Sequence, residues 1–101
     1  MNIKELCSRY AAGQRDFRNL NLMAANLRNL NLVGINLSGA NLTKANLTRT
    51  NLSRANLSGA ILIGATLTET NLTRANLVDA NLSDTILADV NLGQASFKEP
   101  F

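Results

Sequence analysis

The sequence is distinguished first by the residues it lacks: histidine and tryptophan are absent, and cysteine and proline occur once each. The single cysteine, Cys7, excludes an intramolecular disulfide, and without histidine no imidazole can activate that thiol as a nucleophile. Glycine-rich phosphate loops, Cys/His metal spacings and nucleophile–base pairs are also missing. We therefore expect a protein that is not an enzyme and has no catalytic residue, metal site or cofactor.

Long apolar runs are missing as well. No stretch of about 18 apolar residues occurs, so the sequence predicts no membrane span. The opening residues Met1 to Glu5 include an early acidic residue, and no apolar stretch follows them. This start does not resemble a signal peptide, and we expect a cytoplasmic location.

Aromatic side chains are scarce: they make up 4% of the residues, although 46% of the residues are hydrophobic. A compact core normally uses several large aromatic side chains to fill irregular space. Leucine, alanine and asparagine dominate here instead. A core built from one branched side chain repeated many times indicates a regular, one-dimensional architecture.

The sequence repeats with a period of five. From Arg15 onward, a large apolar residue occupies every fifth position, seventeen times without exception. Asparagine usually precedes it, and a small residue usually stands two positions before it, which gives the consensus Ala-Asn-Leu-X-X. The seventeen residues, which we expect to form the ladder of the core, are Phe17, Leu22, Leu27, Leu32, Leu37, Leu42, Leu47, Leu52, Leu57, Leu62, Leu67, Leu72, Leu77, Leu82, Leu87, Leu92 and Phe97.

A period of five fits neither a helix nor a plain strand, but it can be decomposed. The small residue and the leucine are two apart, so they point to one side of an extended segment while asparagine points away. The two X residues are polar, charged or glycine, which is typical of turns. Each repeat is then a very short strand and a corner, and corners that bend the same way close the chain into stacked coils about 4.8 Å apart. We expect the asparagines to bond the backbone at the corners and to form a ladder with their copies above and below.

The tandem units, which cover residues 15–99, resemble the pentapeptide-repeat family, and the entry segment from Tyr10 to Phe17 is similar to the openings of cyanobacterial members. The resemblance implies an all-β fold, a right-handed quadrilateral parallel β-helix with four repeats per coil and about four coils in all. The leucine and the small residue would point inward. One inward column is then larger than alanine and comprises Leu30, Thr50, Thr70 and Val90.

The two ends of such a solenoid need covers, because they expose unpaired edges and apolar cross-section. We divide the chain into a capping helix (1–14), the solenoid (15–99) and a tail (100–101). The helix is expected over about residues 3–12, with Asn2 as N-cap, Gly13 as the terminating residue, and an apolar stripe that includes Ile3, Leu6 and Tyr10.

We expect no capping helix after the repeats at the C-terminal end. Phe17 and Phe97 are expected to fill the two terminal coils. Phe101 either folds back over the last coil or joins Phe97 in a self-complementary homodimer interface. The resemblance favours the dimer, because some members of the family dimerise end to end at this point.

The net charge of +3 is unevenly distributed: residues 1–68 carry eight basic and two acidic residues, and residues 69–101 carry two and five. We predict a structural or protein-binding scaffold with an unknown protein partner. Ile61 and Ile63 flank the inward Leu62, so both should point outward and form a small apolar spot. This spot is either a tolerated exposure or part of a contact patch. The alternative is a DNA mimic that regulates a topoisomerase, as resistance proteins of the resembled family are said to be. That alternative needs a long acidic surface, whereas this chain is short and net basic.

Two further functions are disfavoured by the pattern. Direct nucleic-acid binding would use the basic side chains, but they fall on different faces and no exposed aromatic residues interleave with them for base stacking. Ice binding needs a flat, regular threonine array, and the threonine columns of this sequence are interrupted. The basic residues in question are Arg28, Lys44, Arg49, Arg54 and Arg74.

Overall fold

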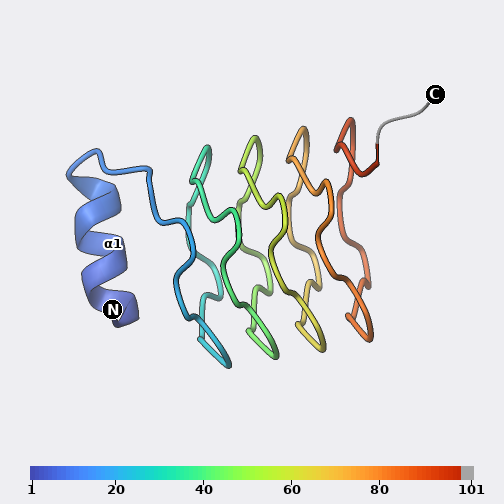
Figure 1. Ribbon diagram of the computed structural model, residues 1–101, viewed down its shortest axis with the longest axis horizontal. Coiled ribbons are helices and arrows are strands. Elements are labelled where there is room, and N and C mark those ends of the chain that lie inside the picture. The colour runs from blue at the N-terminus through green and yellow to red at the C-terminus, as the bar shows by residue number, and fades with distance from the viewer. Residues whose placement is uncertain (99–101) are drawn as a thin grey trace.

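The computed structural model describes residues 1–98. One helix, α1 (Ile3–Ala11), lies across one end, and the rest of the chain winds into coils that stack along the long axis toward the C-terminus (Figure 1). The molecule measures 39 × 23 × 20 Å along its principal axes. The chain is therefore a short rod with a helix at its N-terminal end.

The register between coils is constant. Parallel bridges join each bridging residue to the one twenty positions later, from Asp16–Asn36 to Asn76–Ser96. Twenty residues are four pentapeptides, so one coil contains four repeats, as the resemblance implied. The bridges are isolated and do not extend into longer strands, because the chain turns again after each one.

Backbone hydrogen bonds join the coils around the whole perimeter. The Leu22 N–H donates to the Asn41 carbonyl (2.8 Å), and the Ala24 N–H donates to the Thr43 carbonyl (2.8 Å). In the opposite direction, the Asn41 N–H donates to the Leu20 carbonyl (2.9 Å). The same three bonds recur from repeat to repeat, so each coil satisfies the main-chain groups of its neighbour.

Every corner contains a left-handed residue. The second X residue has a φ between 56° and 71° at twelve non-glycine and four glycine positions, from Asn19 to Gln94. The corner is closed by a turn bond, such as that from the Ala25 N–H to the Leu22 carbonyl (3.1 Å). A positive φ is strained for residues other than glycine and asparagine, most of all for β-branched ones. None of the sixteen corner residues is β-branched.

The asparagines stabilise the corners locally. The Asn41 Oδ1 accepts the Thr43 N–H (3.1 Å) and the Thr43 hydroxyl (2.6 Å). All twelve asparagines that precede a ladder leucine accept the N–H two residues later in this way. The expected bonds between asparagine side chains of successive coils do not occur within residues 1–98. The asparagine column is thus a series of independent turns.

The ladder residues fill the interior, but not evenly. From Phe17 to Leu77, every ladder side chain is at most 3% exposed. In the last coil, Leu82 and Leu92 are partly buried, and Leu87 and Phe97 are 44% and 42% exposed. The prediction that Leu87 and Phe97 lie in the core, with Phe97 as an end plug, is therefore wrong within residues 1–98, where no coil lies over them.

The threonines of the large inward column are fully buried. The Thr50 hydroxyl donates to the Leu27 carbonyl (2.5 Å), and the Thr70 hydroxyl donates to the Leu47 carbonyl (2.7 Å). Leu30 and Val90, in the same column, pack against the core. Because each hydroxyl has an acceptor, the interior accommodates two polar side chains without an unsatisfied group.

Helix α1 begins and ends with capping bonds. Its N-cap, Asn2, accepts the Glu5 N–H through Oδ1 (2.8 Å). At the other end, the Gly13 N–H donates to the Tyr10 carbonyl and the Gln14 N–H donates to the Arg9 carbonyl, each at 3.0 Å, with Gly13 at φ 104°. This pair of bonds is the Schellman motif.

The apolar side of α1 covers the first coil. Leu6 is fully buried, and Ile3 and Tyr10 pack against the core. The Tyr10 hydroxyl donates to the Val33 carbonyl (2.7 Å). By the register of the later coils, that carbonyl would accept the N–H of Gln14, which is used instead to end the helix. The Tyr10 hydroxyl therefore takes the place of the main-chain donor that a preceding coil would supply.

We expect Tyr10→Phe to lower the free energy of unfolding by about 1 kcal/mol, because the Val33 carbonyl loses its donor while the ring keeps its packing. Denaturant unfolding followed by circular dichroism measures the change. The Arg15 guanidinium lies 3.7 Å from the centre of the same ring, and its Nη1 donates to the Tyr10 and Gln14 carbonyls (2.8 and 3.0 Å). Arg15→Gln is therefore the control for loss of the Arg15 contacts with the tyrosine hydroxyl kept. An unchanged midpoint in Tyr10→Phe would show that the hydroxyl has no role in the cap.

The role of the asparagine turns can be tested by removing one asparagine and adding another, with opposite expected effects on stability. Asn51→Ala should destabilise the protein by about 1 kcal/mol, because the Ser53 N–H loses its acceptor (3.1 Å). Ile61→Asn should have the opposite sign, since it supplies the missing acceptor for the Ile63 N–H and removes an apolar side chain that is 37% exposed. Equal losses of stability in both variants would contradict the role of the turns.

Candidate functional site

The C-terminal coil leaves an apolar surface, which we call the open end. It comprises the ladder residues Leu82, Leu87, Leu92 and Phe97, and lies at the opposite end of the rod from α1 (Figure 1). Ile86, beside it, is 52% exposed. The second residue predicted for an interface here, Phe101, lies outside the described residues.

The open end also has unpaired main-chain donors. One coil earlier, the Leu72 N–H donates to the Asn91 carbonyl (2.8 Å). Within residues 1–98, the N–H groups of Leu87 and Leu92 have no such acceptor. Apolar side chains beside unpaired backbone groups form an edge on which another chain can pair.

Acidic residues surround the open end. The four corners of the last coil are Asp79, Asp84, Asp89 and Gln94, and all four side chains are exposed. The ion pairs found within the described chain involve other residues, Arg9 with Glu5 and Arg18 with Asp16. The open end therefore has an apolar centre and a rim of three carboxylates.

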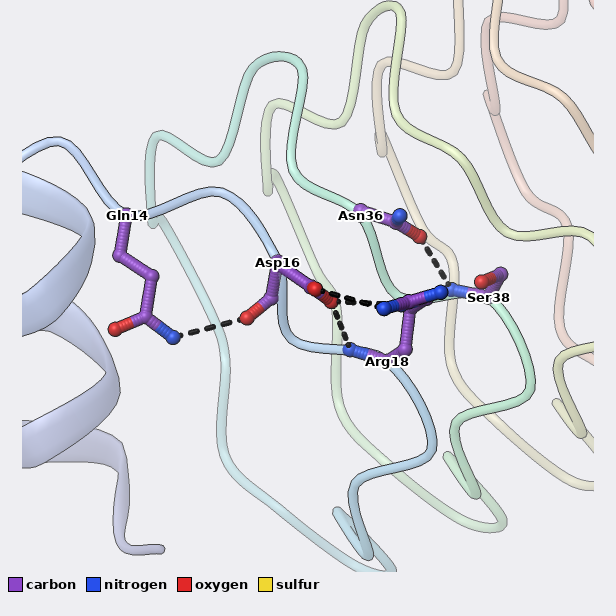
Figure 2. Close-up of polar contacts among 5 residues, drawn as sticks. All are labelled: Gln14, Asp16, Arg18, Asn36 and Ser38. Carbon is purple, nitrogen blue, oxygen red and sulfur yellow. Dashed lines mark hydrogen bonds and ion pairs between the residues drawn. The ribbon is translucent and has the colours of Figure 1, made fainter.

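A second polar cluster lies at the start of the solenoid, where Asp16 occupies an asparagine position (Figure 2). Arg18 binds both carboxylate oxygens of Asp16, through Nε (2.9 Å) and Nη2 (3.0 Å), and its N–H also contacts Oδ1 (3.3 Å). The Gln14 amide donates to the Asp16 main-chain carbonyl (2.9 Å). The corresponding pair in the next coil is neutral, with the Ser38 N–H bound to Asn36 (3.1 Å).

In this cluster, the charges of Asp16 and Arg18 neutralise each other. The hydrogen bonds from the Arg18 side chain and main chain hold the pKa of the Asp16 carboxyl below its ordinary value of 3.8, and Asp16 in turn raises the pKa of Arg18. Both side chains are exposed. The pair thus strengthens the first corner and offers no carboxyl poised for proton transfer near neutral pH.

A third surface is one of the four flat sides of the solenoid, which we call the arginine face; it comprises residues 30–34, 50–54, 70–74 and 90–94. Its only charged residues are Arg54 and Arg74, at the same corner of successive coils. A shallow hollow of about 300 Å³ lies around them, lined by Ser53, Arg54, Asn71, Thr73, Arg74 and Gln94. The basic residues as a group lie on different faces, but the twenty-residue register places Arg54 and Arg74 on the same one. The hollow depends on side-chain positions that the repeat does not specify.

Neither a cluster of metal-binding side chains nor a membrane-spanning helix occurs in residues 1–98. Across residues 1–98, no three or more His, Cys, Asp or Glu side chains gather closely enough to hold a metal ion. No helix in that part of the chain is long and apolar enough to cross a membrane. Cys7 is a partly buried thiol on α1.

The sequence profile of the family described as pentapeptide repeats (8 copies) matches residues 21–59, 50–87 and 75–99. The crystal structure of alr5209, a pentapeptide repeat protein from Nostoc PCC 7120, is 41% identical, with 99% of this chain and 88% of that chain covered and a TM-score of 0.57. No match was found among the curated proteins.

Two further solved structures are similar to this chain. Rfr23, a pentapeptide repeat protein from the cyanobacterium Cyanothece 51142, is 24% identical over 95% of this chain and 96% of its own, with a TM-score of 0.50. HetL, a pentapeptide repeat protein involved in heterocyst differentiation regulation in Nostoc sp. strain PCC 7120, is 39% identical. The match covers 94% of this chain but 44% of HetL, with a TM-score of 0.47.

The Asp16–Arg18 pair predicts a pH-dependent stability difference. Asp16→Asn keeps the turn but removes the ion pair, so it should be slightly less stable than the native chain at neutral pH. Because the native pKa of Asp16 is lowered, its contribution is present above the ordinary carboxyl pKa and is lost as the pH falls through the native value.

Thermal unfolding of both proteins between about pH 7 and about pH 2 measures this difference, which should vanish at the acidic limit. Asp79→Asn, at an exposed corner without an ion pair, is the matched control. A gap between native and Asp16→Asn that persists unchanged at low pH would contradict the prediction.

Proposed function

Because the chain belongs to the pentapeptide-repeat family, we propose that it is a non-enzymatic scaffold that presents rigid solenoid faces and its open end to a protein partner. The observation that carries this proposal is the open end, where apolar side chains are exposed and main-chain donors are unpaired within residues 1–98. The family membership and the parallel coils also support a right-handed winding, since parallel crossover connections are almost always right-handed.

Rigidity is what suits the faces to a scaffold. The coils are joined by backbone bonds at every side, and each asparagine turn fixes a corner. Among the described residues, no buried side-chain nitrogen or oxygen lacks a partner. A surface that is already fixed before binding loses little conformational entropy when a partner docks.

For the open end, we propose a second copy of the chain as the partner. A two-fold contact there is self-complementary and closes after two copies, so it covers both apolar ends at once. Leu87, Leu92 and Phe97 would be buried against their copies, and Phe101 is the further residue that we assign to this interface.

The acidic rim opposes this dimer. A two-fold contact brings Asp84 and Asp89 of one copy near the same residues of the other, and like charges across an interface weaken association. Salt screens such exposed charges over about 10 Å at 0.1 M. The dimer should therefore tighten as the salt concentration rises, which distinguishes it from an interface held by opposite charges.

A DNA-mimic regulator of a topoisomerase is the alternative function. It would need carboxylates along the whole rod, whereas the acidic corners are concentrated in the last coil and the arginine face has no acidic residue. A dimer through the open ends would have an acidic belt between two basic arms. This charge distribution favours the scaffold.

Light scattering over a concentration series tests the dimer. The native chain should approach twice 10.9 kDa, and Phe97→Ser/Phe101→Ser should stay at the monomer mass. Met23→Ser is the matched control, because Met23 is 53% exposed on the first coil, away from the open end. A native chain that is monomeric at every concentration would overturn the homodimer and leave the open end to a different protein.

The same measurement tests the acidic rim. Asp84→Asn/Asp89→Asn should dimerise at lower protein concentration than the native chain at low salt and similarly at high salt. Asparagine suits these corners, since Asn29 occupies the same column as Asp89 with a φ of 60°. Weaker association of this variant would show that the aspartates bind a basic partner group and do not repel their copies.

A further inference from the structure

We propose that the arginine face contains a binding site for a phosphate-type oxyanion, held by Arg54 and Arg74 together with the Ser53 hydroxyl. This site is on the side of the rod, and the three residues assigned to the anion, Ser53, Arg54 and Arg74, precede the last coil and form no part of the dimer proposed at the open end. It assigns a ligand chemistry to a face whose function the scaffold proposal leaves unspecified.

The first argument is the charge. Arg54 and Arg74 are the only basic residues stacked at the same position in successive coils, so their backbones are about 4.8 Å apart. Elsewhere, a basic corner is followed one coil later by glycine or an acid, as Arg49 is by Glu69. Two adjacent cations on a face without any carboxylate repel each other, and an anion between them removes that repulsion.

The second argument is the set of free donors. The Arg74 Nε donates to the Gln94 Oε1 (2.7 Å), which orients this guanidinium along the column and leaves its terminal nitrogens available. In the part of the chain that the structure describes, the Arg54 guanidinium and the Ser53 hydroxyl donate no hydrogen bond. These groups line the same hollow of about 300 Å³, which is ample for one phosphate group.

The number of donors favours a tetrahedral oxyanion. One carboxylate is already satisfied by a single guanidinium fork, which binds its two oxygens side by side. A phosphate has more oxygens, and so it can accept a fork from each arginine and a bond from the hydroxyl. Thr73 does not compete, because its hydroxyl donates to the Asn71 Oδ1. The site therefore fits phosphate, either as the free ion or as a monoester carried by a partner.

Amide NMR titration at constant ionic strength tests the proposal with two probes, inorganic phosphate and a tripeptide with a central phosphoserine. The native chain should show saturable shifts at Ser53, Arg54 and Arg74, with a Kd in the millimolar range. Tighter binding of inorganic phosphate would identify the free ion as the ligand, and tighter binding of the phosphopeptide would identify a phosphorylated partner.

The variant Arg54→Gln/Arg74→Gln should weaken the binding of both probes at least tenfold. Glutamine is suited to this column, because Gln94 occupies the next corner with a φ of 58°. Arg49→Gln is the matched control: Arg49 is at the same position of the repeat on the neighbouring face, where its Nε donates to the Asn29 Oδ1 (3.0 Å). This control should bind as the native chain does.

The proposal is overturned if the shifts do not saturate, or if the double variant retains the native affinity. It is also overturned if Arg49→Gln weakens binding as much as the double variant, because that result would indicate general attraction to a basic chain. Circular dichroism spectra of all variants establish that the coil fold is kept. Because none of these variants alters the open end, failure here leaves the light-scattering test of the scaffold proposal unaffected.

Discussion

The structure depends on one constraint: each coil must meet the next after twenty residues, because only then do the main-chain donors and acceptors of neighbouring coils coincide. A coil that was longer or shorter by one residue would leave buried amides and carbonyls without partners, and each such group is costly. The five-residue period of the side chains follows from this requirement, because a coil of twenty residues with four equal sides has five residues on each side.

The same constraint explains the corners. Closing a side in five residues requires a left-handed residue, and the chain uses arginine, aspartate, lysine and glutamate at such positions as well as glycine. The strain of these conformations persists because the surrounding hydrogen bonds determine the backbone. Residue choice at the corner is thus limited by shape, through the exclusion of β-branched side chains, and is otherwise open to any charge. That freedom is what allows one face to carry two stacked arginines and one end to carry an acidic rim.

Much of the architecture could be predicted because the repeat makes each residue's surroundings nearly identical to those of its copies. The inward orientation of Thr50 and the capping role of Asn2 follow from position alone. The bond from Tyr10 to Val33 does not, because it depends on which carbonyl loses its neighbour when the coils stop. The exposure of Leu87 and Phe97 likewise depends on what lies beyond the last coil, and the hollow beside Arg54 depends on long side chains that the repeat does not fix.

The Tyr10 hydroxyl takes the place of a main-chain N–H as the donor to the Val33 carbonyl, so the N-terminal end of the solenoid is capped by residues of its own. This cap does not depend on the last coil. The two ends of the rod are therefore independent modules, and the number of coils between them is free to vary in evolution. Adding one pentapeptide would rotate the open end by a quarter turn relative to α1. Adding four would restore its orientation and move it one coil further along the axis. In such a molecule, the relative direction of two binding surfaces is set by counting repeats, without redesign of either surface.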